Sequence, residues 1–123
     1  MPDAASPLKI GIAGLGTVGA SVLRVLSERR DVLTRQCGRD LVVTAVSARD
    51  KTKDRGVDLG NIAWFDDPVE MAKTADIDVL IELIGGEGGK ALFTVIAALE
   101  SGRHVVTANK ALLAKHGVRL ATI

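Results

Sequence analysis

Short apolar runs alternate along the chain with stretches of helical periodicity. The apolar runs are rich in Val, Ile and Leu and end at glycine or polar residues, as strands buried on both faces of a sheet do. Strands are therefore predicted at residues 8–13, 41–46, 78–84 and 104–107. The charged residues 51–60 lack periodicity and are predicted to form a loop, while Trp64-Phe65 is expected to pack at an edge of the core.

Helices are predicted between these strands. Apolar residues from Val18 to Leu26 recur at i, i+4, i+7 and i+8, which predicts a helix that begins at Thr17 and ends near Arg30. A second, shorter helix is expected to begin at Asp67-Pro68, because aspartate is a good N-cap and proline fits the first helical position.

Two further helices are predicted from their ends. The apolar stripe from Leu92 to Leu99 is followed by Gly102, which stands where a glycine commonly terminates a helix. Asn109 is a plausible N-cap for a helix that runs through Lys115 and is expected to stop at Gly117.

Strands that alternate with helices at these lengths specify an α/β fold. We predict a doubly wound parallel sheet of the Rossmann type, with the strand 8–13 at its centre. A chain of 123 residues, 47% of them apolar, is long enough for one buried core, so residues 1–123 are expected to form a single domain.

Composition narrows the function classes. The 16 basic and 15 acidic side chains nearly cancel and are spread along the chain, so neither nucleic acid nor an anionic membrane is the expected partner. A single cysteine, Cys37, permits no internal disulfide, and no Cys/His cluster has the spacing of a metal site. With no signal peptide or membrane-spanning run in the sequence, we expect a cytoplasmic protein that binds a small molecule.

The sharpest motif is the glycine loop Gly14-Leu15-Gly16-Thr17-Val18-Gly19, which matches GxGxxG between the first strand and the first helix. In this context the first glycine permits a tight turn, the second lets the backbone approach a pyrophosphate, and Gly19 lets helix and strand pack closely. Thr17 and Val18 would present backbone N–H groups to phosphate oxygens. We therefore predict a dinucleotide site here; the alternative is a glycine turn that only packs the corner.

The end of the second strand bears on the choice of cofactor. An acidic residue there would bond the ribose 2′-OH of NAD, whereas an arginine suits the 2′-phosphate of NADP. The strand runs into Ser47-Ala48-Arg49-Asp50, with Lys51 and Lys53 beyond it, so Arg49 favours NADP. A solvated basic loop, largely neutralised by its aspartates, explains the same residues equally well.

Two more segments are predicted at the carboxyl edge of the sheet, where ligands bind in open α/β folds. Gly85-Gly86 ends the third strand and is small enough to pass close to a nicotinamide ribose, although an ordinary turn also explains it. Glu82, within that strand, is expected either to reach the rim or to have a hydrogen-bonding role, because an unpaired buried carboxylate is costly.

Lys110 follows Asn109 and is expected in the first turn of a helix, where the helix dipole disfavours a cation. A carbonyl-bearing or anionic ligand at the same edge would compensate, and Lys110 would then orient it or assist proton transfer. The alternative is a lysine that extends into water.

Taken in order, these motifs resemble the N-terminal domain of homoserine dehydrogenase. The resemblance spans nearly the whole chain, and the segments Ile81-Glu82-Leu83-Ile84-Gly85-Gly86 and Thr107-Ala108-Asn109-Lys110-Ala111 are its most specific parts. It implies an NAD(P)-dependent oxidoreductase that interconverts L-homoserine and L-aspartate 4-semialdehyde on the route to threonine and methionine. By resemblance, Thr17 and Val18 contact the pyrophosphate, Arg49 the adenosine phosphate region, and Ile84 and Gly85 the nicotinamide side. Lys110 is then placed at the active site, as a catalytic and cofactor-binding residue.

The resemblance also implies a substrate domain beyond Ile123, which would carry the homoserine-binding residues and the interface of a homo-oligomer. The 123 residues alone are therefore expected to be inactive. The alternatives are another dehydrogenase of similar architecture, such as an aspartate dehydrogenase or a dihydrodipicolinate reductase, and a dinucleotide-sensing domain without chemistry. The T-A-N-K segment argues against those two enzymes, and a sensor would have no need of Lys110.

Overall fold

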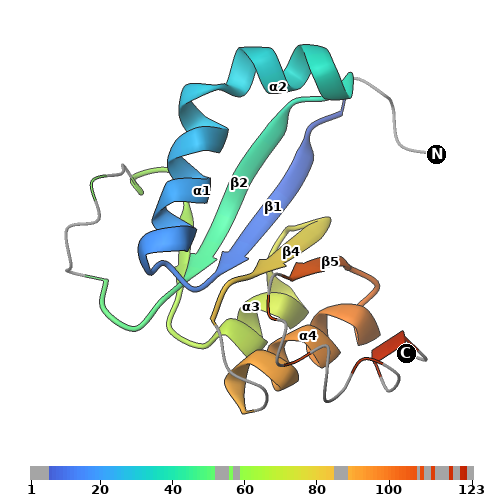
Figure 1. Cartoon of the computed structure of the whole chain (residues 1–123). Helices are drawn as coiled ribbons and strands as arrows, with labels where there is room; N and C mark the ends of the chain where they lie inside the picture. The colour runs from blue at the N-terminus through green and yellow to red at the C-terminus, as the bar shows by residue number, and fades with distance from the viewer. Residues whose placement is uncertain are drawn as a thin grey trace.

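The computed structural model describes residues 6–51, 56, 59–84, 89–107, 109, 112, 117, 120 and 121. In this part of the chain, five strands form one parallel sheet in the order β3-β2-β1-β4-β5 (Figure 1). They are β1 (Leu8–Ala13), β2 (Leu41–Ser47), β3 (Ala63–Phe65), β4 (Val79–Glu82) and β5 (His104–Thr107). The prediction that the first strand is central is confirmed.

Helices cover the sheet from two sides. The elements are α1 (Thr17–Glu28), α2 (Arg30–Cys37), α3 (Pro68–Thr74) and α4 (Lys90–Glu100). Under α1, Leu23 packs with Ile10 and Ile12 of β1 and with Val46 of β2. On the other face, residues of α3 and α4 pack with Ala13, Ala45 and Leu80 of the sheet (Figure 1). Two apolar clusters on opposite faces of a parallel sheet are the doubly wound arrangement that the strand and helix order predicts.

Two elements of the structure were not predicted from the sequence patterns. The strand β3 has three residues and pairs with the end of β2, so Trp64 and Phe65 do pack at an edge, but as part of the sheet. The helix α2 follows α1 after a break at Arg29 and ends at Gly38, whose φ is 73°. It buries none of its residues, which is why apolar periodicity did not reveal it.

Two predicted element ends are corrected by the structure. The strand β4 ends at Glu82 rather than residue 84, because the Ile84 N–H group bonds to the Glu82 side chain instead of a neighbouring strand. Gly117, predicted as the residue at which a helix stops, is itself helical, as are Leu112, Leu120 and Ala121. Leu112 and Leu120 are buried against α4.

An ion pair joins α2 to the start of β2. The Arg30 guanidinium donates to the Asp40 carboxylate, with a distance of 2.8 Å from Nε to Oδ1. This hydrogen bonding lowers the pKa of Asp40 below its usual value and raises the pKa of Arg30. Because the folded-state pKa of Asp40 is lowered, the pair stabilises the fold at neutral pH and loses this contribution as the pH falls through that pKa.

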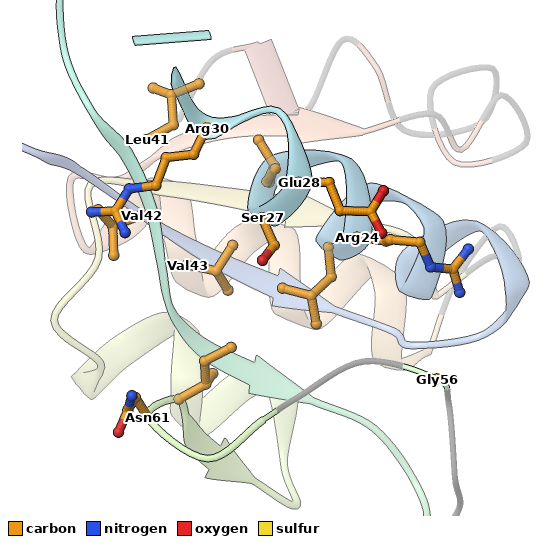
Figure 2. A pocket seen from close by; sticks show the side chains of 12 residues that line it. Arg24, Ser27, Glu28, Arg30, Leu41, Val42, Val43, Gly56 and Asn61 are labelled. Carbon is orange, nitrogen blue, oxygen red and sulfur yellow. The ribbon is translucent and has the colours of Figure 1, made fainter. Parts of the chain in front are cut away.

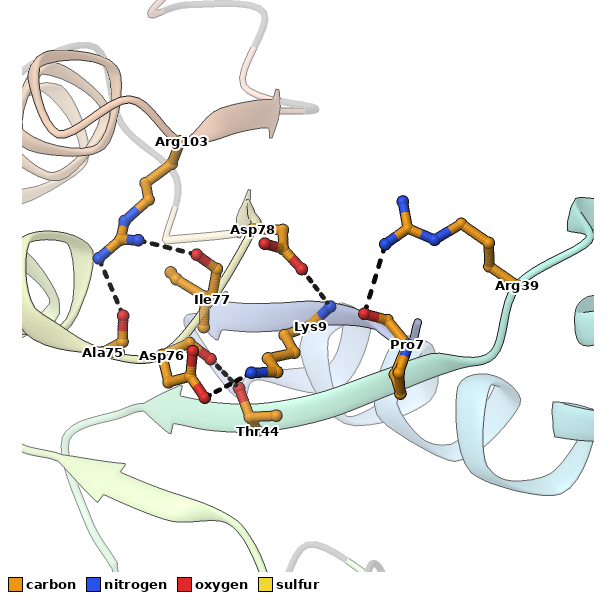
Figure 3. A network of polar contacts seen from close by, with 9 residues as sticks. All are labelled: Pro7, Lys9, Arg39, Thr44, Ala75, Asp76, Ile77, Asp78 and Arg103. Carbon is orange, nitrogen blue, oxygen red and sulfur yellow. Dashed lines mark hydrogen bonds and ion pairs between the residues drawn. The ribbon is translucent and has the colours of Figure 1, made fainter. Parts of the chain in front are cut away.

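At the amino-terminal edge of the sheet, Arg103 closes the end of α3 (Figure 3). Its guanidinium donates to the carbonyl oxygens of Ala75 and Ile77 at 2.9 Å, and at 3.3 Å to those of Ala72 and Lys73. A helix leaves its last carbonyl groups without intrahelical donors and carries partial negative charge at this end. One side chain from the loop after α4 therefore ties that loop to α3 and to the start of β4.

We expect Arg103→Met to destabilise the fold by about 2 kcal/mol, because several partly buried carbonyl groups lose a charged donor while the aliphatic stem is kept. Thermal unfolding should then occur about 5 to 10 °C lower. The matched control is Arg39→Met, which removes a guanidinium that donates to the carbonyl oxygens of Ser6 and Pro7, just before β1, and not to a helix end. A loss no greater than that of the control would contradict the capping role.

Candidate dinucleotide-binding site

A pocket of about 540 Å³ lies at the carboxyl ends of β1, β2 and β4. This is the position in which open α/β sheets bind ligands, and the volume is within the range of small-molecule sites. Residues from five separate stretches of chain line it: Gly14, Leu15, Gly16, Ser47, Ala48, Arg49, Asp50, Asp66, Pro68, Leu83, Ile84 and Lys90. Of the predicted cofactor-binding residues, it brings together Gly14, Gly16, Arg49 and Ile84.

The turn after β1 requires glycine at Gly14. Its φ is +100°, which side chains disfavour, and a Cβ there would stand 2.7 Å from the carbonyl oxygen of Leu83. The Gly14 N–H donates to the Ser47 carbonyl, and the Leu83 N–H donates to the Ala13 carbonyl, both at 2.8 Å. The turn is therefore held between the ends of β2 and β4, at the base of the pocket.

The other two glycines of the motif differ in what surrounds them. A Cβ on Gly19 would lie 1.9 Å from the Gly14 carbonyl oxygen, so only glycine lets α1 approach the turn. A Cβ on Gly16 would meet no atom within 4 Å, and Gly16 has an ordinary extended conformation. Gly16 is thus not needed for packing within the described structure, and its open side faces the pocket that it lines.

The first turn of α1 is suited to an anion. Its N-cap, Gly16, makes no side-chain cap hydrogen bond, and no acidic residue lies in this turn. Thr17 and Val18 are exposed, with 60% of Val18 accessible, while Gly19 is buried. Backbone N–H groups at the start of a 12-residue helix, next to a glycine turn, are a favourable place for a phosphate group.

On the β2 side of the pocket, Arg49 is exposed. The same pocket includes two charged residues that sequence reasoning missed, Asp66 and Lys90. Lys90 is the first residue of α4, and its ammonium group lies 3.4 Å from the Asp67 carboxylate. Its position directly after the glycine-rich segment that follows β4 is the sequence signal that points to this edge.

On the β4 side, Ile84 lines the pocket and is held by Glu82. The Glu82 side chain has no solvent exposure, and the hydrogen-bonding role considered for it is confirmed. Its two oxygens accept from the Ile84 N–H at 2.6 Å and from the Thr107 hydroxyl at 2.7 Å.

Asn109 is confirmed as a capping residue, since its Oδ1 accepts from the Leu112 N–H at 3.0 Å. Gly85 and Lys110, also predicted for the site, lie outside the described residues.

A second pocket, of about 390 Å³, lies between α1, the first half of β2 and the segment around Asn61 (Figure 2). Arg24, Ser27 and Glu28 reach it from α1, and Leu41 to Val43 form its other side. It lies along the first half of β2 rather than at the carboxyl ends of the strands, so it does not belong to the candidate site.

In the part of the chain that the structure describes, no group of three or more His, Cys, Asp or Glu side chains is placed to hold a metal ion, and no helix is long and apolar enough to cross a membrane.

Comparison with known proteins agrees with this geometry. Residues 14–123 match the family described as "Homoserine dehydrogenase, NAD binding domain". The chain belongs to this family. A homoserine dehydrogenase of Pseudomonas aeruginosa is 42% identical over 111 residues, which are 90% of this chain and 25% of that protein. A homoserine dehydrogenase of Neisseria gonorrhoeae is 40% identical over 111 residues, which are again 90% of this chain and 25% of that protein.

Solved structures agree with the assignment to the homoserine dehydrogenase NAD-binding family. The structure of a homoserine dehydrogenase from Thiobacillus denitrificans matches with a TM-score of 0.85 and 35% identity, over 96% of this chain and 27% of that chain. The predicted family, the Rossmann-type α/β fold and the class of cofactor, NAD or NADP, are therefore confirmed. The chain spans about a quarter of the length of these relatives.

Proposed function

We propose that residues 1–123 form the NAD(P)-binding domain of an enzyme that interconverts L-homoserine and L-aspartate 4-semialdehyde. The observation that carries the proposal is the pocket at the sheet edge, where the glycine turn, Arg49 and Ile84 meet in a member of the homoserine dehydrogenase family. When bound, the nicotinamide exchanges a hydride with the substrate. The residues that hold homoserine belong, in this proposal, to a substrate domain outside these residues.

The proposed roles of the site residues rest on the described pocket and on the family motifs. Gly14, Gly16 and Gly19 shape the turn, and the N–H groups of Thr17 and Val18 bind the pyrophosphate. Arg49, just after β2, binds the adenosine side. Ile84, just after β4, and Gly85, the next residue in the sequence, contact the nicotinamide side. By resemblance to the family, Lys110 acts on the hydroxyl proton that leaves during oxidation.

The setting of the enzyme follows from the same proposal. The partner is a small molecule, and the assembled enzyme is a homo-oligomer whose subunits meet through the substrate domain. The exposed free thiol of Cys37 is compatible with a reducing compartment and so supports the proposed location in the cytoplasm.

Titration of the 123-residue chain with NADPH and NADH, followed by calorimetry, tests the binding proposal directly. We expect saturable binding of at least one dinucleotide at one site per chain. A folded chain that binds neither would contradict the proposed function of this pocket.

Arg49 is expected to favour NADP through a charge-assisted contact with the 2′-phosphate. Such a contact contributes about 1.5 to 3 kcal/mol, so Arg49→Asp should weaken NADPH binding by roughly 10-fold or more and NADH binding by much less. Arg24→Asp is the matched control, because it makes the same charge change on an exposed part of α1 outside the pocket. Equal losses for the two cofactors would show that Arg49 does not read the phosphate.

A further inference from the structure

Glu82 is a buried acidic residue that the cofactor-binding roles above leave unexplained. It is the last residue of β4 and has no solvent exposure. Its Oε2 accepts from the Ile84 N–H at 2.6 Å, and its Oε1 accepts from the Thr107 hydroxyl at 2.7 Å. Ile84 lines the pocket, whereas Thr107 ends the neighbouring strand β5, so Glu82 connects two segments at the carboxyl edge.

The neighbouring hydrogen bonds show which group donates to Glu82. The Thr107 hydroxyl oxygen accepts from the Asn109 N–H at 3.0 Å, and the Asn109 side chain accepts from the Leu112 N–H at 3.0 Å. A hydroxyl has one proton to donate, and that of Thr107 is directed to Glu82. A continuous series of hydrogen bonds therefore runs from Ile84 through Glu82 and Thr107 to Asn109.

This series is not needed to pair the strands. The strands β4 and β5 are already joined by a parallel ladder in which Glu82 lies opposite Thr107. A buried carboxyl group costs free energy that an apolar side chain would not, even when it is hydrogen-bonded. Glu82 adds hydrogen bonds at residues that follow the paired part of the strands. It binds the Ile84 N–H directly, and it is linked to the Asn109 N–H through the Thr107 hydroxyl.

We propose that Glu82 is a positioning residue that sets the nicotinamide half of the dinucleotide site by holding Ile84, Thr107 and Asn109 in one arrangement. The inference rests on the proposed function, because it concerns the same pocket. Arg49, which carries the proposed adenosine contact, follows β2, two strands away from β4 in the sheet order, and takes no part in these contacts. Loss of Glu82 should therefore affect the nicotinamide half and leave the adenosine half as it is.

The test compares a whole dinucleotide with its adenosine half on the same variants. The wild-type chain is titrated with NADPH and 2′,5′-ADP, or with NADH and ADP if it prefers NADH. For Glu82→Gln, which keeps the volume but offers one acceptor oxygen instead of two, we expect about 10-fold weaker binding of the dinucleotide. Binding of the adenosine ligand should stay within about twofold, since a change confined to the nicotinamide side leaves its contacts intact.

Thr107 provides a second set of variants should Glu82→Gln fail to fold. Thr107→Val removes the hydroxyl and should reproduce the selective loss, whereas Thr107→Ser keeps it and should restore dinucleotide binding. Thr94→Val is the matched control, because it makes the same change at a buried threonine whose hydroxyl bonds within α4, to the Lys90 carbonyl at 2.6 Å. It should lower stability without changing the ratio of the two affinities.

The outcomes separate the two proposals. Equal weakening of both ligands by Glu82→Gln and Thr107→Val, or unchanged binding of both in folded variants, would overturn the positioning role while the proposed function stands. A wild-type chain that binds neither ligand would overturn the proposed function, and the positioning role with it.

Discussion

Gly19→Ala is expected to prevent stable folding of the domain. The new Cβ would lie 1.9 Å from the Gly14 carbonyl oxygen and 2.9 Å from its carbon, and both are backbone atoms. These atoms have little freedom to move, because the Gly14 N–H is hydrogen-bonded to the Ser47 carbonyl. A shift large enough to make room for the Cβ would separate α1 from β1. Overpacking commonly costs about 1 to 3 kcal/mol, and a clash between backbone segments should cost at least the upper value. Urea unfolding measures the difference.

Gly16→Ala, in the same loop, is the control with the opposite expectation. Since its Cβ would meet nothing within 4 Å and its φ of −70° suits alanine, the free energy of unfolding should change by less than about 1 kcal/mol. Dinucleotide binding should nevertheless weaken by about 10-fold or more, because the added methyl group stands where the pyrophosphate must approach the backbone. A stable Gly19→Ala variant, or a Gly16→Ala variant that binds normally, would contradict these separate roles.

Lys110→Ala is expected to reduce homoserine oxidation by roughly 100-fold while cofactor affinity stays within a few-fold. Hydride transfer from homoserine must be accompanied by loss of its hydroxyl proton, and a basic group near that oxygen lowers the barrier. Lys110 follows Asn109 directly, and Asn109 lies just beyond β5, at the same edge of the sheet as the pocket. The measurement is steady-state turnover of homoserine by the proposed enzyme that carries this domain, with cofactor titration of the same variant.

Lys73→Ala serves as its control, since Lys73 lies in the last turn of α3, outside the pocket. This variant should retain turnover within about twofold, as expected for a solvated surface lysine. Near-normal turnover by Lys110→Ala would move Lys110 out of the active site and weaken the proposed reaction.

Parts of the site that depend on local chemistry were predictable from the sequence. The turn at Gly14 and the close approach at Gly19 are demanded by backbone geometry within one strand-turn-helix unit, so the motif and its place in the chain were sufficient. Likewise, Asp67 and Asn109 were predicted as caps, and their side chains accept from N–H groups two and three residues ahead. Such contacts join near neighbours in the chain, and short patterns encode them.

The central place of the strand 8–13 was also predicted from the sequence, because parallel crossovers constrain how successive strands assemble. The short strand β3 was not, since its three residues become a strand only through pairing with β2. The helix α2 was missed for a related reason: with no buried residue, it leaves no apolar stripe in the sequence.

The doubly wound sheet, the glycine turn at its centre and the family can be inferred from the amino-acid order, since apolar periodicity and motif spacing are local properties of the chain. The folded arrangement was needed to find that Lys90 and Asp66 join Arg49 at one pocket, and that Glu82 bonds to Thr107, 25 residues away. Contacts of this kind depend on which strand ends become neighbours and on how far each strand continues before its backbone turns away. No pattern along the chain records that distance, because it is set by packing and hydrogen bonding between segments that meet only in the folded protein.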